Sequence, residues 1–362
     1  MKARLIHPGE LDAGLIARWN VLRASNPVYR SPFYAASFTR AVGLARDDAR
    51  VAVIEDAGEV VGFLPFHRTR SDVGKPIGGH INDYHGPILQ AGRAFSSKLL
   101  LQAAKIAAYD FNHLPVSIGV TGEGAWAFSN SPQMDLGDGY DAYNGRKASP
   151  SWTKAQAQMR RRWRKTEAEL GPIRFTTHDP CDNAFAQHWA MRRALHARLR
   201  VRPDFSYGWI RTVLEWIRAT DEPDLAGVFS TMHAGDRLVA AHFGMRSAGV
   251  WHWWYPSYDL EAHNLSPGIN LIDQCARAAQ GEGIATFDFG RGDNHYKELF
   301  ANQAVTLCEG SMTRAGSLAA GVRHASQALV SLAGKLPLGR MESYPQRAVA
   351  RLISGVALPS RP

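Results

Sequence analysis

Two segments of the sequence share the same order of apolar strand, glycine-containing turn and apolar strand. In residues 51–66 the turn is Asp56-Ala57-Gly58-Glu59, and in residues 226–245 it is His233-Ala234-Gly235-Asp236. Helix-like stretches precede each predicted hairpin, and further sheet and another helix follow it. A matching order of elements predicts an internal duplication. We therefore expect two α/β halves that face each other across a cleft.

The length of 362 residues also favours two domains. We interpret the polar, glycine-rich segment Gly137–Ser149 as a linker, followed by a helix that Ser151 caps and that runs to Leu170. Residues 94–109 are predicted to be helical and Val116–Val120 to form a strand. The predicted domains are residues 1–149, residues 150–312 and a helical basic tail over 313–362.

The net charge of +9 favours anionic partners without specifying one. The three cysteines, Cys181, Cys275 and Cys308, are widely spaced, which fits a reducing cytoplasm and predicts no metal site. Met1–Glu10 has no apolar signal core, and no apolar run approaches the ~18 residues of a membrane span. The tail mixes apolar and basic residues, so it fits either packing on the domain, which we favour, or peripheral contact with a membrane. The oligomeric state stays open.

The stretch from Trp251 to Phe300 carries the candidate chemistry, in the order strand, helix, strand and polar loop. Ser266 and Pro267 are suited to begin the helix. We expect the free amides of Gly268, Ile269 and Asn270 to favour a phosphate at this N-terminus. The alternative is an ordinary capped helix.

The strand Ala285–Gly290 alternates, so Phe287 and Phe289 share one face and Asp288 lies on the other. A buried carboxylate needs hydrogen-bond donors, so Asp288 either pins a loop or belongs to a site. Asp293 is predicted to cap a short helix that carries Tyr296 and Lys297.

Two further groups of residues leave alternatives open. The run Met159–Lys165 holds four arginines on a predicted helix, which indicates either a solvated surface or contact with a phosphate or an anionic acceptor. His242 and His252 lie on predicted strands, where each is either a base or a packed histidine. The sequence has no Gly-Lys-Ser/Thr phosphate loop and no Gly-x-Ser-x-Gly nucleophile elbow.

These segments resemble the GNAT-superfamily acetyltransferases of bacterial cellulose and exopolysaccharide biosynthesis. The resemblance covers residues 31–310. Its strongest part is Tyr258-Asp259, Ser266-Pro267-Gly268, Phe287-Asp288-Phe289-Gly290-Arg291-Gly292-Asp293 and Tyr296-Lys297. It implies two GNAT-like lobes, each a mixed, mostly antiparallel sheet flanked by helices. Acetyl-CoA would lie between splayed strands at 238–245 and 284–290, with its pyrophosphate near Ser266, Gly268, Ile269 and Asn270. The family's usual pyrophosphate loop is richer in glycine than this one.

The implied reaction is direct N- or O-acetyl transfer to a polysaccharide, sugar or cell-envelope precursor. Tyr296 matches the tyrosine that protonates the departing thiolate in many relatives, and Asp288, His252 or Asp83 would act as base. The acceptor pocket is assigned to a set of residues that comprises Asp83, Trp254, Asp259, Asp293 and Lys297. Two alternatives remain: a Fem-like peptidyltransferase that uses aminoacyl-tRNA, the one case in which nucleic acid would bind, and a non-catalytic accessory protein of exopolysaccharide synthesis.

Overall fold

The computed structural model describes residues 1–120, 124–292, 294–323 and 325. The chain divides into two compact units that are interleaved along the sequence. The first unit comprises residues 1–22, 46–128 and those from 308 onward, and the second comprises residues 23–45 and 129–307. The predicted domain ranges are based on the repeated order of elements along the sequence. The division into compact units does not test these ranges, so they stay a prediction.

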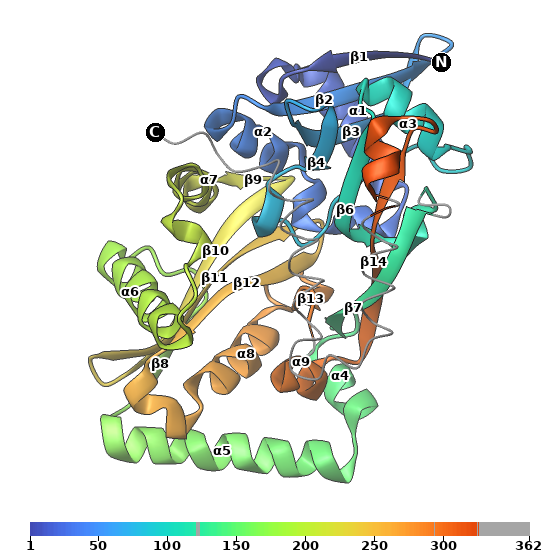
Figure 1. Ribbon diagram of the computed structural model, residues 1–362. Coiled ribbons are helices and arrows are strands. Elements are labelled where there is room, and N and C mark those ends of the chain that lie inside the picture. Colours follow the sequence, from blue (N-terminus) through green and yellow to red (C-terminus); the bar gives the residue numbers. More distant parts are fainter. Residues whose placement is uncertain (121–123, 293, 324, 326–362) are drawn as a thin grey trace, which may run out of the picture. The chain divides into compact units, whose positions relative to one another are not determined.

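Figure 1 labels the helices and strands. The helices are α1 (Ala13–Ala24), α2 (Ala36–Ala45), α3 (Ser97–Ala104), α4 (Tyr140–Lys147), α5 (Pro150–Leu170), α6 (Asp182–Leu199), α7 (Gly208–Ala219), α8 (Pro267–Ala278) and α9 (His295–Phe300). The strands are β1 (Lys2–Ile6), β2 (Ala49–Asp56), β3 (Glu59–Arg68), β4 (Val73–Pro76), β5 (Ile88–Leu89), β6 (Ala108–Pro115), β7 (Ala125–Asp135), β8 (Ile173–Thr176), β9 (Asp221–Glu222), β10 (Leu225–Ala234), β11 (Arg237–Ser247), β12 (Val250–Tyr258), β13 (Thr286–Asp288) and β14 (Gln303–Thr313).

The order of elements repeats along the chain, as the sequence predicts. Strand, two helices, hairpin, strand, helix and strand occur first as β1, α1, α2, β2–β3, β4, α3 and β6, and again as β8, α6, α7, β10–β11, β12, α8 and β13. The strand orders β1-β2-β3-β4-β6 and β8-β10-β11-β12-β13 also match. In each, three antiparallel pairs are followed by one parallel pair. The two predicted hairpins are thus confirmed and hold equivalent places in two runs of strands, each of them mixed and mostly antiparallel.

In the second unit, helices cover both faces of the strands. Trp253 of β12 packs in one core cluster with Leu271 of α8 and Met159 of α5. On the other face, Tyr255 of β12 contacts Trp189 of α6. In a regular strand Trp253 and Tyr255 would lie on the same face, because they are two residues apart. They lie on opposite faces here because the pairing of β11 with β12 shifts register between Phe243 and Met245, which marks a β-bulge. The helix predicted to begin at Ser266 and Pro267 is α8, and its residues Ile272, Cys275 and Ala276 are buried against the sheet.

The predicted linker at Gly137–Ser149 is wrong. Most of it forms α4, whose residues Tyr140 and Tyr143 are buried in the core of the second unit. The Tyr140 hydroxyl donates to Asp273 of α8, and the Tyr143 hydroxyl donates to the Phe300 carbonyl over 2.5 Å. Glycine and polar residues therefore mark the turns around α4, while its two aromatic rings anchor it.

Three other boundaries differ from the sequence prediction. Ser149 caps α5 in place of Ser151, because its hydroxyl accepts the Trp152 amide at 3.2 Å. Helix α3 ends at Ala104, since Lys105 adopts a left-handed conformation with φ of 51°. The strand that follows is β6, whereas the predicted strand at Val116–Val120 forms a short 3-10 turn. Of the predicted tail, residues 324 and 326–362 lie outside the described part of the chain.

The close packing of α7 on β10 gives a stability prediction. A Cβ atom at Gly227 would lie 2.3 Å from the Ile217 carbonyl oxygen, so Gly227→Ala must push α7 away from the sheet. We expect the free energy of unfolding in urea to fall by about 1–3 kcal/mol, as for other overpacked sites. At Gly145 of α4 a Cβ meets no atom within 4 Å, so Gly145→Ala should be neutral or slightly stabilising. Equal stability of both variants would contradict the packing.

Candidate functional site

The strands β12 and β13 run parallel for only part of their length. β12 has nine residues and β13 has three, and their ladder joins residues 250–252 to residues 286–288. On its other edge β12 pairs with β11 as far as Tyr258. From Trp253 onward, the edge of β12 that faces away from β11 therefore has no strand partner among the described residues. Pro256 on this edge has no amide, and its carbonyl accepts from Arg192 at 2.5 Å. The Trp254 amide donates to His242, so an extended ligand can pair with the backbone groups that remain.

Helix α8 begins close to this open edge, but with fewer free amides than expected. The amides of Ile269 and Asn270 donate to the Ser266 carbonyl oxygen at 3.1 and 3.4 Å. Ser266 has a left-handed backbone with φ of 51° and forms no side-chain capping bond. Among the described residues, only the Gly268 amide is left in the first turn without an acceptor. The prediction of three free amides is corrected to one, next to the partly exposed residues 266, 268 and 269.

Asp288 lies at the end of the β12–β13 ladder, where it is buried and held by three donors. These are the Ser131 hydroxyl at 3.0 Å, the Gln133 amide at 2.6 Å and the Gly290 backbone amide at 2.8 Å. The first two come from β7, and the third is in the loop after β13. The hydrogen bonds agree with the interpretation that Asp288 pins this loop. Its catalytic role stays a prediction.

His252 is the ladder partner of Asp288 and is also fully buried. Its Nδ1 lies 3.6 Å from Asp288 Oδ1, and its ring meets the edge of Phe33 at a centroid distance of 4.9 Å. Trp254 packs on the same phenylalanine at 5.6 Å. The structure thus brings His252, Asp288 and Trp254 to the point where the strands separate.

The loop after β13 is tied down by a buried lysine. Lys297 of α9 donates from Nζ to the Gly290 carbonyl at 3.1 Å and to the Arg291 carbonyl at 2.7 Å. Its neighbour Tyr296 is partly exposed, and its ring meets Phe289 edge-on at 6.0 Å. The predicted cap Asp293 lies outside the described residues. Lys297 thus shapes the loop, and the catalytic role of Tyr296 remains a prediction.

Two other residues predicted to bind the acceptor lie elsewhere. Asp259 pairs with Arg237 and accepts the Glu261 amide at 2.9 Å, so it holds the 3-10 segment Leu260–Leu265 that leads to α8. Asp83 belongs to the first unit, in the loop between the 3-10 turn Gly79–Ile81 and β5. Neither position tests the predicted contact with an acceptor.

His242 is confirmed as a packed histidine. Its ring stacks on Trp253 at 3.8 Å, and its Nε2 accepts the Trp254 amide at 3.1 Å. Burial, with a smaller contribution from electrostatic repulsion by neighbours that include Arg192, holds its pKa well below the ordinary value. The His242 side chain thus accepts a hydrogen bond from a backbone amide that, at the bulge, is not paired with β11. Sequence reasoning located this histidine beside the aromatic strand but gave no signal for the bulge.

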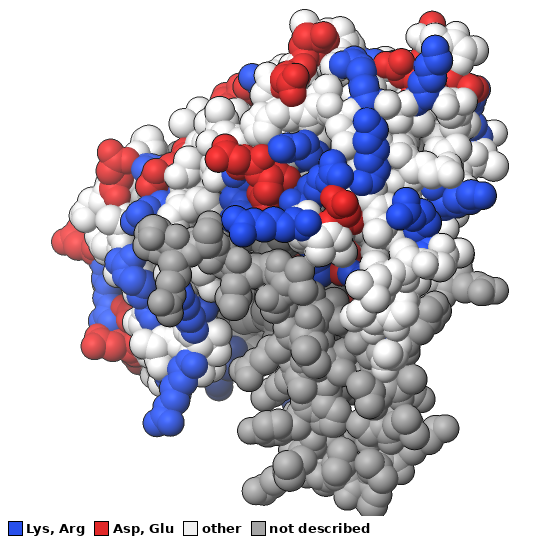
Figure 2. All heavy atoms as spheres, turned by 45° about the horizontal axis from the view of Figure 1, so that its top comes forward, with Lys and Arg blue, Asp and Glu red and all other residues white. Residues whose placement is uncertain are grey.

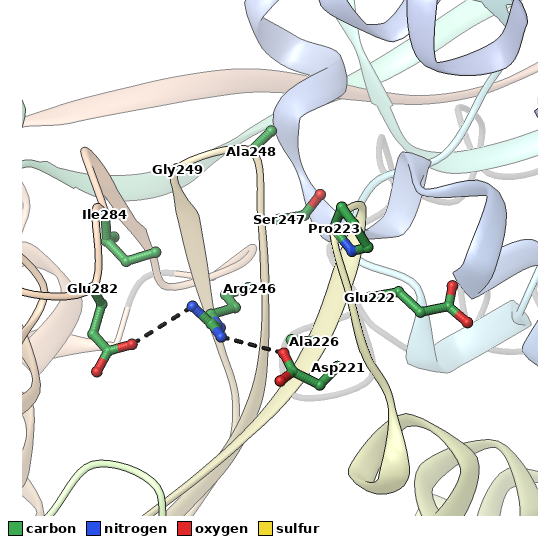
Figure 3. Close-up of a pocket in the computed structure, with 10 residues that line it drawn as sticks. All are labelled: Asp221, Glu222, Pro223, Ala226, Arg246, Ser247, Ala248, Gly249, Glu282 and Ile284. Atoms are coloured by element: carbon green, nitrogen blue, oxygen red, sulfur yellow. Dashed lines mark hydrogen bonds and ion pairs between the residues drawn. The ribbon is translucent and has the colours of Figure 1, made fainter. Parts of the chain in front are cut away.

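A separate pocket of about 350 Å³ lies at the other end of β12, around the turn that joins β11 to β12 (Figure 3). Arg246 lies between two acidic side chains there, with Asp221 at 3.4 Å and Glu282 at 3.6 Å. None of the predicted site residues lines it. Its one arginine is already paired and its other charges are acidic, so we place the candidate site at the separating strands.

The described residues also limit other chemistry. Within them, no group of three or more His, Cys, Asp or Glu side chains is arranged to hold a metal ion. No helix in the described part of the chain has the length and apolar character needed to cross a membrane. On the face drawn in Figure 2, basic side chains alternate with acidic ones, so the net charge is not gathered there in one continuous basic surface.

Comparison with known proteins agrees with this fold. Residues 153–298, from α5 to α9, match the sequence profile of a family described as acetyltransferase (GNAT) domain. No curated protein sequence matches the chain. The profile match, with the repeated strand order, identifies a GNAT-like tandem fold and supports an acyltransferase.

Two solved structures are similar over most of the chain. One is the C-terminal domain (DUF2156) of a putative lysylphosphatidylglycerol synthetase from Agrobacterium fabrum, with a TM-score of 0.54, 11% identity, and coverage of 86% of this chain and 95% of that one. The other is FemX, with a TM-score of 0.54, 10% identity, and coverage of 86% and 96%. At such identities the similarity concerns the fold alone.

The buried histidine gives a pH prediction. Because the pKa of His242 is lowered in the folded protein, the unfolded chain binds its proton first as the pH falls below about 6.5. The stabilisation is therefore complete above that pH and is lost on acidification. In His242→Gln, the slope of unfolding free energy against pH between 7 and 5 should decrease by up to about 1.4 kcal/mol per pH unit. Urea titrations at each pH measure it, and an unchanged slope would contradict a neutral buried His242.

Proposed function

We propose that the protein transfers an acyl group, with acetyl-CoA as donor, directly to an amine or hydroxyl acceptor. The open edge of β12 beyond Trp253 is the observation that carries this proposal. The pantetheine arm of CoA contains two amides in an extended chain, which suits pairing with an unpaired strand edge. The edge leads toward the Gly268 amide at the start of α8, where the helix dipole favours a diphosphate.

The reaction needs no covalent enzyme intermediate. The acceptor nitrogen or oxygen attacks the thioester carbon, the carbon–sulfur bond breaks, and the thiolate takes up a proton. Backbone amides on the open edge would stabilise the developing oxyanion, and fixed positions of the two substrates would supply much of the rate.

We assign the proton donor to Tyr296, because it is the partly exposed member of the three predicted catalytic residues. Asp288 and His252 are 1% and 0% exposed, so direct contact with a substrate requires the separating strands to admit it. We therefore propose that these two side chains hold the loop and the strand end in place. Removal of the acceptor proton falls to one of these two side chains, which together form the last pair of the ladder.

The acceptor class is a further part of the proposal. A polysaccharide, sugar or cell-envelope precursor agrees with the sequence resemblance and with the partly exposed Trp254 beside the strand opening, since aromatic rings pack on sugars. We also propose that the two repeats occupy residues 1–149 and 150–312.

Aminoacyl transfer is the second candidate. It is favoured by the two similar structures, whose names refer to a lysylphosphatidylglycerol synthetase and to FemX, a Fem-type protein. Titration calorimetry separates the candidates. Acetyl-CoA binding supports the first, binding of aminoacyl-tRNA without acetyl-CoA supports the second, and binding of neither favours the accessory protein.

A substitution at the start of α8 tests the donor position. A Cβ at Gly268 would lie 3.7 Å from Tyr258 Cδ1, which is ordinary contact, so larger residues are tolerated. Gly268→Asp places a carboxylate beside the diphosphate and should weaken acetyl-CoA binding about tenfold or more, whereas the isosteric Gly268→Asn should retain most of the affinity. Calorimetry measures both, and equal affinities of the two variants would argue against a diphosphate here.

Tyr296→Phe tests the proton donor. If the hydroxyl acts in the transition state, kcat should fall about 10²-fold or more while KM for the donor changes little. The melting temperature of the same preparation shows whether the hydroxyl has a structural role. A destabilised variant with full kcat would reject the assignment.

A further inference from the structure

A groove of about 290 Å³ lies between α5 and α8, apart from the residues to which the reaction is assigned. Its lining comes from one face of each helix: Gln156, Met159, Arg160, Trp163 and Arg164 of α5, and Asn270, Asp273, Gln274 and Arg277 of α8. Within each helix these residues follow the i, i+3, i+4 and i+7 spacing of one helix face, so they form a single stripe. The arginine run thus has one defined face on this groove, while Arg161 does not line it.

The groove carries positive charge that the protein does not neutralise. Arg277 is paired with Asp273 at 2.8 Å. Arg160 and Arg164 are exposed and have no acidic partner among the described residues. Guanidinium groups pair well with phosphate, because their donors match its oxygens in a bidentate arrangement.

A buried donor in the same groove has no partner. The Asn270 side chain is 3% exposed, and its Nδ2 forms no hydrogen bond with any described residue. Buried amide groups are nearly always hydrogen-bonded, so an orphaned donor that lines a groove indicates a missing acceptor. Asn270 lies in the first turn of α8, where the helix dipole also favours an anion.

An aromatic side chain completes the groove. Trp163 is partly buried against the core of the second unit and also lines the groove. Tryptophan rings stack well on nucleobases. Two unpaired guanidiniums, an orphaned amide and an indole ring together match a phosphorylated nucleoside.

We propose that this groove binds the 3′-phosphorylated adenosine end of the CoA donor, with Arg160 and Arg164 on the 3′-phosphate. The Asn270 amide donates to a phosphate or ribose oxygen, and Trp163 lies against the adenine. This inference rests on the proposed function, because the helix that would face the diphosphate also forms one wall of the groove. If the groove binds the 3′-phosphate, the protein should bind CoA more tightly than a donor that lacks this phosphate.

The test compares CoA with dephospho-CoA, which lacks only the 3′-phosphate. Calorimetry on the full chain should show CoA binding about tenfold or more tightly, since two charge-assisted contacts are lost with the phosphate. In the Arg160→Gln/Arg164→Gln double variant this ratio should fall to about one. Arg161→Gln, which changes the charge of the same helix outside the groove, should keep the wild-type ratio.

The outcomes separate this inference from the proposed function. Equal affinities of the wild type for CoA and dephospho-CoA would overturn the groove assignment and leave acyl transfer from CoA standing. A ratio that is unchanged in the double variant, or lost equally in Arg161→Gln, would also overturn it. If neither CoA nor dephospho-CoA binds to the wild type, both the groove and the proposed function are rejected.

Discussion

The unequal pairing of the two edges of β12 is the constraint on which the candidate site depends. One edge is paired with β11 along the strand, while the other pairs with β13 over three residues. An unpaired backbone edge within a sheet is unfavourable unless water or a ligand satisfies it. Here the edge lies between the covering helices and ends near the start of α8. Backbone groups on it that lack a protein partner can therefore hold an extended acyl-donor molecule by hydrogen bonds.

Several buried contacts keep this arrangement open and fixed. Asp288 ties the end of β13 to β7, and Lys297 holds the carbonyls of the following loop, so the short strand cannot swing back to extend its ladder. On β12, the stacked His242 takes the Trp254 amide and stabilises the bulge. Residues that the sequence presents as catalytic candidates are thus partly explained by the need to hold the backbone apart.

The sequence predicts the repeat well because each hairpin is local and alternates clearly around its turn. The start of α8 and the burial of Asp288 likewise follow from short-range patterns. Features that depend on distant partners were not predictable. The segment read as a linker becomes α4 because Tyr140 and Tyr143 find partners on α8 and at Phe300. The free amides at α8 were overestimated because the left-handed Ser266 presents its carbonyl to two of them. The groove was not predictable because it depends on how α5 and α8 lie side by side, and the stripe of residues on either helix alone does not indicate a ligand.

Amide hydrogen exchange along β12, measured by NMR with and without CoA, tests the central claim most directly. The amides on this edge that no protein group accepts should exchange rapidly in the free protein and become protected when CoA binds; Trp254, whose amide donates to His242, and Pro256, which has no amide, are not among them. Those of residues 250–252 should be protected in both states, because they lie within the ladder to β13. If CoA binds and the exchange of residues 253–258 does not change, the donor does not lie on this edge, and the account is contradicted.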